Sequence, residues 1–229
     1  AYDLFLKWQG SNWQRPRYIA VRQLPFIPKE REIDDVIAGC NNEIALFLQI
    51  GKDTGARAGE IYSLQWIQID FESRTINITA EKGSNPRIFR ISNKLFDILS
   101  QFPKKDQQIF KRYLTLNNLR RSYERQRNRM GHKLGNPRLQ RVTFHTLRHW
   151  KGTMEYHKTK DILHVMQVLG HKNIKNTLLY VQLEKALFDE ETEYISKVAK
   201  APHEIQSLIE QGFEFVCSSE DLKFFRKRK

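Results

Sequence analysis

The chain has little cysteine, and no apolar run in it is long enough to cross a membrane. Cys40 and Cys217 are the only cysteines among the 229 residues, and they lack the paired spacing of a metal site. We therefore expect free thiols rather than a disulfide or a structural zinc. The apolar runs fall short of the roughly 20 residues that span a bilayer, and the start lacks a signal-peptide pattern. We expect a cytoplasmic protein, in the cytosol or nucleoid of its host cell, with no membrane partner.

Acidic residues are also few relative to basic ones. Lys and Arg number 39 against 26 Asp and Glu, which gives a formal net charge of +13. This excess is typical of a polyanion binder, although charge alone does not name the polyanion. Many of the basic residues fall in one expected helix, 117–133, which holds the candidate DNA-binding residues Arg120, Arg121, Arg125, Arg127 and Arg129. A solvated helix with local pairing to Glu124 is the alternative, and we favour phosphate contact.

The hydrophobic periodicity predicts a mainly α-helical chain with one small β-hairpin, an α+β fold. Helical patterns cover residues 28–40, 41–55, 117–133, 143–159, 160–172 and 176–200. Between Trp66 and Ser92 the period changes to two, with a Gly- and Pro-bearing turn between TINIT and RIFRIS. We expect three regions: the end of a truncated N-terminal domain with a basic linker (1–28), a main domain (29–200), and a helix with short strands and a basic tail (201–229).

Polar residues collect near the ends of the last expected helices. In TFHTLRHWKGTM, His145, Arg148 and His149 share one helix face. The next helix stops at a glycine, so that His171 lies just past its end. Tyr180 follows in a short helix among apolar residues. Taken singly, these features are typical of a solvated face, a turn histidine and a packed aromatic ring. The whole set is what indicates chemistry.

That set resembles the tyrosine recombinase (phage integrase) family, and the amino-acid sequence around these motifs is most similar to integrases of archaeal viruses and mobile elements. TGARAGEI at 54–61, a lysine-bearing hairpin, HTLRH at 145–149, LGH and a tyrosine nine residues further on follow the family's order and spacing. The resemblance covers residues 30–185. It implies the tyrosine recombinase catalytic-domain fold for the main domain. It also implies a DNA-clamping domain, of which residues 1–28 would be the end.

The resemblance also implies roles for individual residues. The catalytic set would be Arg57, Lys82, His145, Arg148, His171 and Tyr180, with Glu60 and His149 in support. By this resemblance Tyr180 is the nucleophile and Glu60 orients Arg57. Trp150 and Lys151 replace the small or hydroxyl residues that often follow this motif in bacterial members, so close analogy to those enzymes is weaker.

The expected chemistry agrees with these residue types. Attack by Tyr180 on a phosphodiester breaks the P–O5′ bond and keeps its energy in a 3′-phosphotyrosine, so the strand can be resealed without ATP. Arg57 and Arg148 provide guanidinium forks for the phosphate oxygens. His145 is the candidate base, because a phenol with a pKa near ~10 is protonated at neutral pH. Lys82 is the candidate acid for the leaving oxygen; an ordinary solvated turn lysine is the alternative.

No metal or cofactor is expected. His145 and His149 are spaced i, i+4 but lack the glutamate of HExxH, and His171 is expected to donate to a phosphate oxygen instead. The predicted function is site-specific DNA recombination or integration. The predicted partners are double-stranded DNA and further copies of the chain, as a tetramer at synapsis and a monomer in isolation. A type IB topoisomerase and a DNA-binding protein without catalysis are the alternatives, and neither fits the spacing and the intact set of residues as well.

Overall fold

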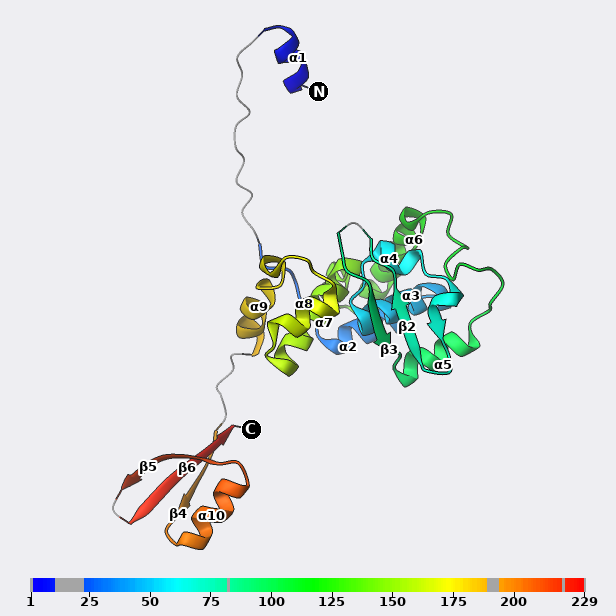
Figure 1. Ribbon diagram of the computed structural model, residues 1–229. Helices are drawn as coiled ribbons and strands as arrows, with labels where there is room; N and C mark the ends of the chain where they lie inside the picture. Colours follow the sequence, from blue (N-terminus) through cyan, green and yellow to red (C-terminus); the bar gives the residue numbers. More distant parts are fainter. Residues whose placement is uncertain (1, 11–22, 82, 189–193, 220, 229) are drawn as a thin grey trace.

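The structure of the chain is a computed structural model that describes residues 2–10, 23–81, 83–188, 194–219 and 221–228 (Figure 1). The described part is mainly helical with two small antiparallel sheets. The α+β class expected from the sequence is therefore confirmed. A short helix, α1 (Tyr2–Trp8), lies near the start of the chain. Nothing in these ranges forms a helix long and apolar enough to span a membrane.

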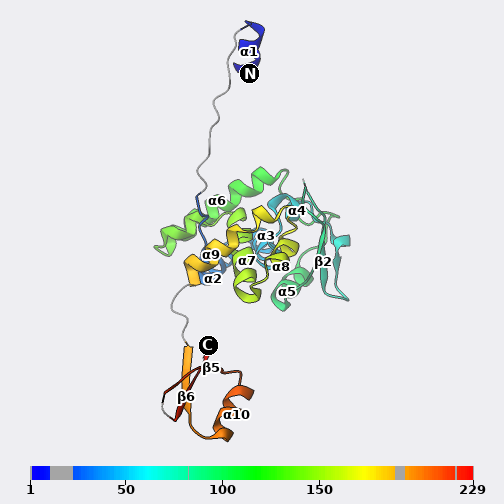
Figure 2. The same cartoon turned by 60° about the vertical axis from the view of Figure 1, so that its left-hand side comes forward.

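The main unit is a set of helices gathered around α3 (Figure 2). Its helices are α2 (Glu30–Ala38), α3 (Asn42–Thr54), α4 (Ala58–Tyr62), α5 (Asn93–Gln101), α6 (Leu116–Lys133), α7 (Phe144–Thr159), α8 (Ile162–Leu169) and α9 (Leu179–Phe188). Three 3-10 turns join them: η1 (Trp66–Gln68), η2 (Pro137–Arg141) and η3 (Ile174–Asn176). Helices α4 and α5 have no counterpart among the elements expected from the sequence. The helix expected from residue 176 begins three residues later, after η3.

Helix α3 forms the centre of the core. The Asn41 side chain begins it by accepting a hydrogen bond from the Ile44 N–H at 3.0 Å. Gly55 ends it in the left-handed conformation, at φ 64°. The Phe47 ring is 1% exposed, and its centroid lies 5.2 Å from that of Phe110 and 4.7 Å from that of Phe144. This aromatic cluster fixes α3 against α7, the helix that carries the HTLRH motif.

The expected hairpin is present as part of a three-stranded antiparallel sheet, β1 (Ile69–Asp70), β2 (Thr75–Ile78) and β3 (Arg87–Arg90). Its register pairs Thr75 with Arg90 and Ile78 with Arg87. Ile76 and Ile78 are fully buried while Asn77 between them is exposed, which is the alternation that the period of two predicted. The tip of this hairpin carries Lys82, which lies outside the described residues.

The C-terminal residues form a second unit with its own hydrophobic cluster. It contains β4 (Tyr194–Ala199), α10 (Pro202–Glu210), β5 (Glu214–Ser219) and β6 (Leu222–Arg228), with strand order β4-β6-β5. Leu208 of α10 packs with Phe213 and Phe225 over one face of the sheet. The prediction that 194–199 continue a helix was wrong. Their β-branched and aromatic residues pair with β6 over six register positions, so the sheet begins before the expected boundary at residue 200.

Candidate active site

Helices α4 and α7 bring two of the predicted arginines to one cavity. The cavity has a volume of about 310 Å³ and lies beside α6. Its lining residues are Ala56, Arg57, Ala58, Arg120, Tyr123, Glu124, Arg127, Thr143, Phe144, His145 and Arg148. Arg57 and Arg148, which are more than 90 positions apart in sequence, thus line the same cavity, and both guanidinium groups are positively charged. A cavity of this kind suits a phosphate group.

Arg57 is placed by the residue three positions after it. The Arg57 N–H donates to Glu60 Oε2 at 2.8 Å, and Arg57 Nη1 lies 4.0 Å from Glu60 Oε1. Arg57 Nη1 also donates to the Glu81 carbonyl at 3.2 Å. The Arg57 side chain remains 35% exposed, whereas that of Glu60 is fully buried. The guanidinium is therefore held through Nη1, while the exposed part of the side chain stays open to a ligand.

Arg148 is held more tightly, because its guanidinium ties two helix ends together. Nη1 donates to the Gly55 carbonyl at 2.8 Å, and Nη2 donates to the Leu169 carbonyl at 2.6 Å. The residue is 2% exposed. Burial lowers the pKa of Arg148 to about 10, with a further contribution from the neighbouring cations Arg57 and Arg87. The side chain remains charged at neutral pH, and the α3 and α8 ends set its direction.

Tyr180 lies among the histidines and is almost wholly buried, at 1% exposed. Its hydroxyl lies 3.4 Å from Nδ1 of His149, and its ring centroid lies 6.4 Å from that of His171. Burial raises the pKa of Tyr180 to about 12, although the charge of Arg148 acts in the opposite direction. The phenol is thus protonated at neutral pH and requires a base.

The hydrogen-bond partner of the Tyr180 hydroxyl is His149 rather than His145, which the sequence favoured as the base. His145 is exposed, lines the cavity, and has its ring centroid 4.5 Å from that of His149. Although the residue keeps exposed surface, the surrounding protein displaces part of the water around its ring, and this desolvation, with the charges of Arg148 and Arg57, lowers the pKa of His145. The i, i+4 spacing on α7 therefore puts one histidine at the cavity and the other at the tyrosine.

His171 follows the left-handed Gly170 that ends α8, as the sequence predicted. Its Nδ1 lies 3.0 Å from Thr177 Oγ1, and the residue is 8% exposed. Burial and the surrounding arginines, Arg148 first, lower the pKa of His171 to about 4. The ring is consequently neutral near pH 7. With Oγ1 of Thr177 at Nδ1, Nε2 is left as the nitrogen for a phosphate oxygen.

The free energy of unfolding is expected to fall as pH drops from about 6.5 to 4. In that window the unfolded chain protonates His171 at its ordinary pKa of 6.5, while the folded chain does so only near 4. The unfolded state binds more protons there, so acid favours unfolding by at most ~1.4 kcal/mol per pH unit from this residue. Urea unfolding at pH 7, 5.5 and 4.5 should show a shallower fall for His171→Asn than for the wild type. Parallel curves would contradict the assignment.

Two residues of the site were not predicted from the sequence. Gly152 lies on α7 facing Tyr180: a Cβ added to it would come within 2.6 Å of Tyr180 Cζ. Arg87 at the start of β3 is buried and pairs with Glu60, at 2.5 Å between Nη2 and Oε2. An arginine within a strand pattern carries no signal of its own. The glycine in the middle of the motif helix does carry one, because alanine is favoured over glycine there by about 1 kcal/mol.

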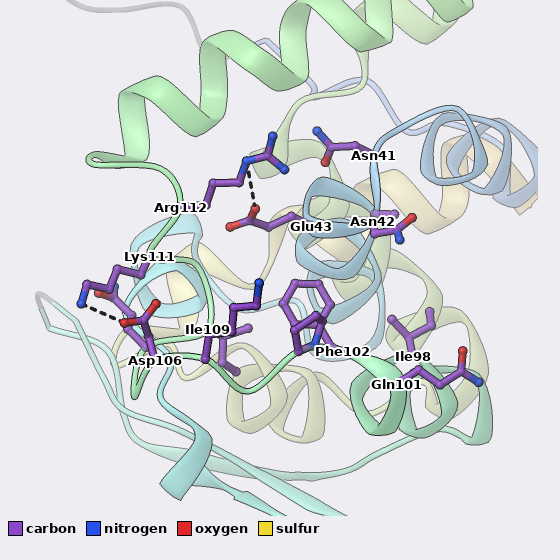
Figure 3. A pocket seen from close by; sticks show the side chains of 14 residues that line it. Asn41, Asn42, Glu43, Ile98, Gln101, Phe102, Asp106, Ile109, Lys111 and Arg112 are labelled. Atoms are coloured by element: carbon purple, nitrogen blue, oxygen red, sulfur yellow. Dashed lines mark hydrogen bonds and ion pairs between the residues drawn. The ribbon is translucent and has the colours of Figure 1, made fainter.

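A larger cavity lies elsewhere, and none of the predicted catalytic residues that the structure describes lines it. It measures about 820 Å³ and lies between the start of α3, the end of α5 and residues 103–112. Figure 3 shows Glu43, Phe102 and Arg112 along its wall, with Glu43 Oε2 4.0 Å from Arg112 Nε. Across the ranges that the structure describes, no three His, Cys, Asp or Glu side chains are grouped to hold a metal ion.

A family model described as the phage integrase family matches residues 29–186. The chain belongs to this family. The resemblance seen in the sequence is thereby confirmed, and the match covers all the motifs quoted for it.

Individual proteins that are similar to this integrase-family chain are also recombinases or integrases. It is 27% identical over 202 residues to "Tyrosine recombinase XerA" of Saccharolobus solfataricus, covering 86% of this chain and 65% of the relative. The catalytic domain of bacteriophage HP1 integrase superposes with a TM-score of 0.54 at 26% identity, covering 82% of this chain and 95% of that one. XerH bound to a palindromic difH substrate in a post-cleavage complex gives a TM-score of 0.56 at 21% identity, covering 73% and 52%. The chain spans less than two thirds of the length of the curated relative.

Proposed function

We propose that this chain is the catalytic part of a site-specific DNA recombinase or integrase that cleaves and rejoins strands through a 3′-phosphotyrosine, without metal or ATP. One observation carries the proposal. Arg57 and Arg148 meet at a single cavity, and Arg148 and Tyr180 are close enough for the arginine charge to act on the phenol. A cationic phosphate cradle beside a buried phenol is the arrangement that tyrosine transesterification requires.

In the proposed reaction the Tyr180 oxygen attacks the phosphorus, and the P–O5′ bond breaks. Arg57 and Arg148 neutralise the charge that builds up on the non-bridging oxygens, and His171 donates to one of them. The phenol proton passes to His149, its hydrogen-bond partner at 3.4 Å, with His145 at the cavity side of the same helix. This departs from the base assignment made on the sequence. Glu60 keeps Arg57 in place.

Lys82 is proposed as the acid that protonates the departing 5′ oxygen. Its hairpin is attached to the site near the tip, because the Glu81 carbonyl accepts a hydrogen bond from Arg57 Nη1 at 3.2 Å. Glu81, the residue before Lys82, is thus in contact with an arginine that lines the cavity. A lysine there completes the proton balance: one proton leaves Tyr180 and one arrives at O5′.

The proposed DNA surface is α6. Its Arg120 and Arg127 line the catalytic cavity, and a second hollow on the helix is formed by Asn118, Arg121, Glu124, Arg125 and Asn128. Arg127 is partly used by the fold, since its Nη1 donates to the Val142 carbonyl at 3.0 Å. The exposed arginines are therefore Arg120, Arg121, Arg125 and Arg129. Because these arginines are exposed and the similar XerH recombinase is bound to a palindromic difH substrate, we propose double-stranded DNA as the partner.

Removing two of these charges is expected to weaken DNA binding and its salt dependence together. Arg121→Gln with Arg125→Gln should reduce the slope of log affinity against log salt by about 2, at ~0.9 per phosphate contact. The matched control replaces Lys105 and Arg112, which line the other cavity, with Gln. Fluorescence anisotropy with a labelled duplex at several salt concentrations measures both. Equal slopes for the two double variants would remove α6 from the DNA surface.

Assembly and location complete the proposal. We propose that copies of the chain pair on DNA and act as a tetramer at synapsis, in the cytosol or nucleoid where DNA is found. Residues 1–28 are proposed as the end of a DNA-clamping domain and linker, and the helical unit from residue 29 to the end of α9 as the catalytic domain. The second unit, which begins with β4 at Tyr194 rather than at residue 201, is proposed to contact DNA or another copy. Deleting residues 194–229 should leave strand cleavage unchanged and impair paired-site assembly.

The test of the function is a trapped covalent complex. Wild type and Tyr180→Phe are incubated with supercoiled DNA in chelator and quenched with detergent, and DNA-linked protein is measured. The proposal expects an adduct from the wild type alone. An adduct that persists in Tyr180→Phe would remove the tyrosine from the mechanism. An adduct without site preference or pairing of sites would indicate a topoisomerase, and none from either protein would indicate binding without catalysis.

A further inference from the structure

A buried cation at the start of β3 joins three parts of the proposed site. Arg87 is 7% exposed, and its Nη2 lies 2.5 Å from Glu60 Oε2, while the Glu60 side chain is fully buried. Nη1 of Arg87 lies 3.5 Å from the other carboxylate oxygen. Burial raises the pKa of Glu60, but the Arg87 and Arg57 hydrogen bonds and the charges of Arg87 and Arg148 lower it below its ordinary value. The pair is therefore ionised and fixed.

Glu60 passes this constraint to Arg57. The same Oε2 that binds Arg87 accepts the Arg57 N–H at 2.8 Å. Oε1 lies 4.0 Å from Arg57 Nη1 and 3.5 Å from the Glu81 N–H. Each oxygen of the carboxylate is thus shared between Arg87 and the segment that positions Arg57. A change in Arg87 must alter how Glu60 divides its hydrogen bonds.

Arg87 also orders the hairpin on the C-terminal side of its tip. Nη1 donates to Ser84 Oγ at 2.6 Å and to the Asn85 carbonyl at 3.0 Å. A lysine could not make these contacts and the Glu60 fork together, because its ammonium is a single point of charge. The planar guanidinium is what allows one residue to hold both the carboxylate and the turn.

Ser84 and Asn85 are also bound to the end of α8. Ser84 Oγ donates to the Gly170 carbonyl at 3.1 Å, and the Asn85 N–H donates to the same carbonyl at 3.0 Å. Gly170 is the residue before His171, and a Cβ on it would come within 2.1 Å of Arg87 Nη1. The glycine is thus required both by its φ of 65° and by the closeness of Arg87.

We propose that Arg87 is a positioning residue for strand cleavage: through Glu60, Ser84 and Asn85 it sets Arg57, the hairpin that carries Lys82, and the turn that carries His171. Arg87 is not among the residues that line the cavity proposed for the phosphate. The proposal rests on the function proposed above and adds a residue to it. A misplacement of about 1 Å at such a site can lower a rate by ~100-fold, so Arg87→Lys is expected to cleave about 100-fold more slowly.

A second variant separates positioning from folding. Arg87→Met alone takes from the buried Glu60 carboxylate its guanidinium partner at 2.5 Å and is expected to destabilise the fold. Combining it with Glu60→Gln replaces the ion pair by neutral residues of similar size, which is often close to neutral for stability. This double variant should regain thermal stability near that of the wild type without regaining cleavage. The matched control is Arg90→Met, an exposed arginine on the same strand.

The experiment measures the rate of adduct formation with supercoiled DNA at saturating concentration, together with DNA affinity and thermal unfolding. The proposal expects Arg87→Lys and the double variant to bind DNA like the wild type, and to form adduct about 100-fold more slowly. Wild-type rates in a stable double variant would overturn the positioning role and leave the proposed function intact. Absence of any adduct from the wild type would overturn the proposed function and this role with it.

Discussion

Arg148→Lys is expected to lower the rate of strand cleavage by about 100- to 1000-fold, the loss seen when a preorganised donor is removed from an oxyanion site. The native guanidinium donates to the Gly55 and Leu169 carbonyls at 2.8 and 2.6 Å, which leaves its remaining N–H groups in a fixed direction. Lysine keeps the charge but cannot satisfy both carbonyls and a phosphate. Single-turnover adduct formation at saturating DNA measures this loss.

The control for this prediction is an arginine outside the site whose guanidinium is held by an ion pair. Arg138 donates to Glu32 through Nε at 2.7 Å, and Arg138→Lys should leave cleavage within a few-fold of the wild type. Arg148→Ala is a poorer test, because it leaves two buried carbonyls unsatisfied and costs about 1–3 kcal/mol for each. An Arg148→Lys protein that cleaves at the wild-type rate would contradict the assignment of Arg148 to the phosphate.

Gly152→Ala is expected to be destabilising and to impair cleavage, although alanine favours helix over glycine by about 1 kcal/mol. The added Cβ would lie 2.6 Å from Tyr180 Cζ and 2.9 Å from Leu169 Cδ1, so the tyrosine ring must move away from α7. The hydroxyl then loses its 3.4 Å contact with His149. We expect unfolding to be easier by roughly 1–3 kcal/mol, as for other overpacked cores, and cleavage to fall by at least ~10-fold.

Gly131→Ala provides the matched control on another helix. Its Cβ would meet Gln140 Cγ at 3.2 Å, a flexible side chain that can shift, so stability should be unchanged or slightly raised. Thermal unfolding and adduct formation are measured for both proteins. If Gly152→Ala gains stability and cleaves normally, Tyr180 does not depend on α7 for its position.

Much of the site could be predicted from the sequence because its motifs carry local signals. Gly170 ends a periodic helix, and the structure places His171 directly after it. The period of two between Trp66 and Ser92 predicted the strands correctly. The polar face of α7 was likewise visible in the spacing of His145 and His149. Local periodicity and capping determine these features.

The remainder depends on contacts between distant segments, which one sequence does not reveal. Arg148 looked like a member of a solvated face, but it is 2% exposed because two helix ends converge on it. Arg87 looked like an ordinary strand residue until Glu60 was placed beside it. Residues 194–199 looked helical, but they pair with a strand more than twenty residues further along. Tertiary pairing overrode the local pattern there.

Tyr180 itself is expected to become bonded to a DNA 3′ end. Mass spectrometry of the adduct after nuclease and protease digestion measures this directly. We expect a single modified peptide from LGHKNIKNTLLYVQLEK, carrying a nucleotide 3′-phosphate on Tyr180 and formed in chelator. A nucleotide found on another residue, or joined through a 5′ phosphate, would contradict it.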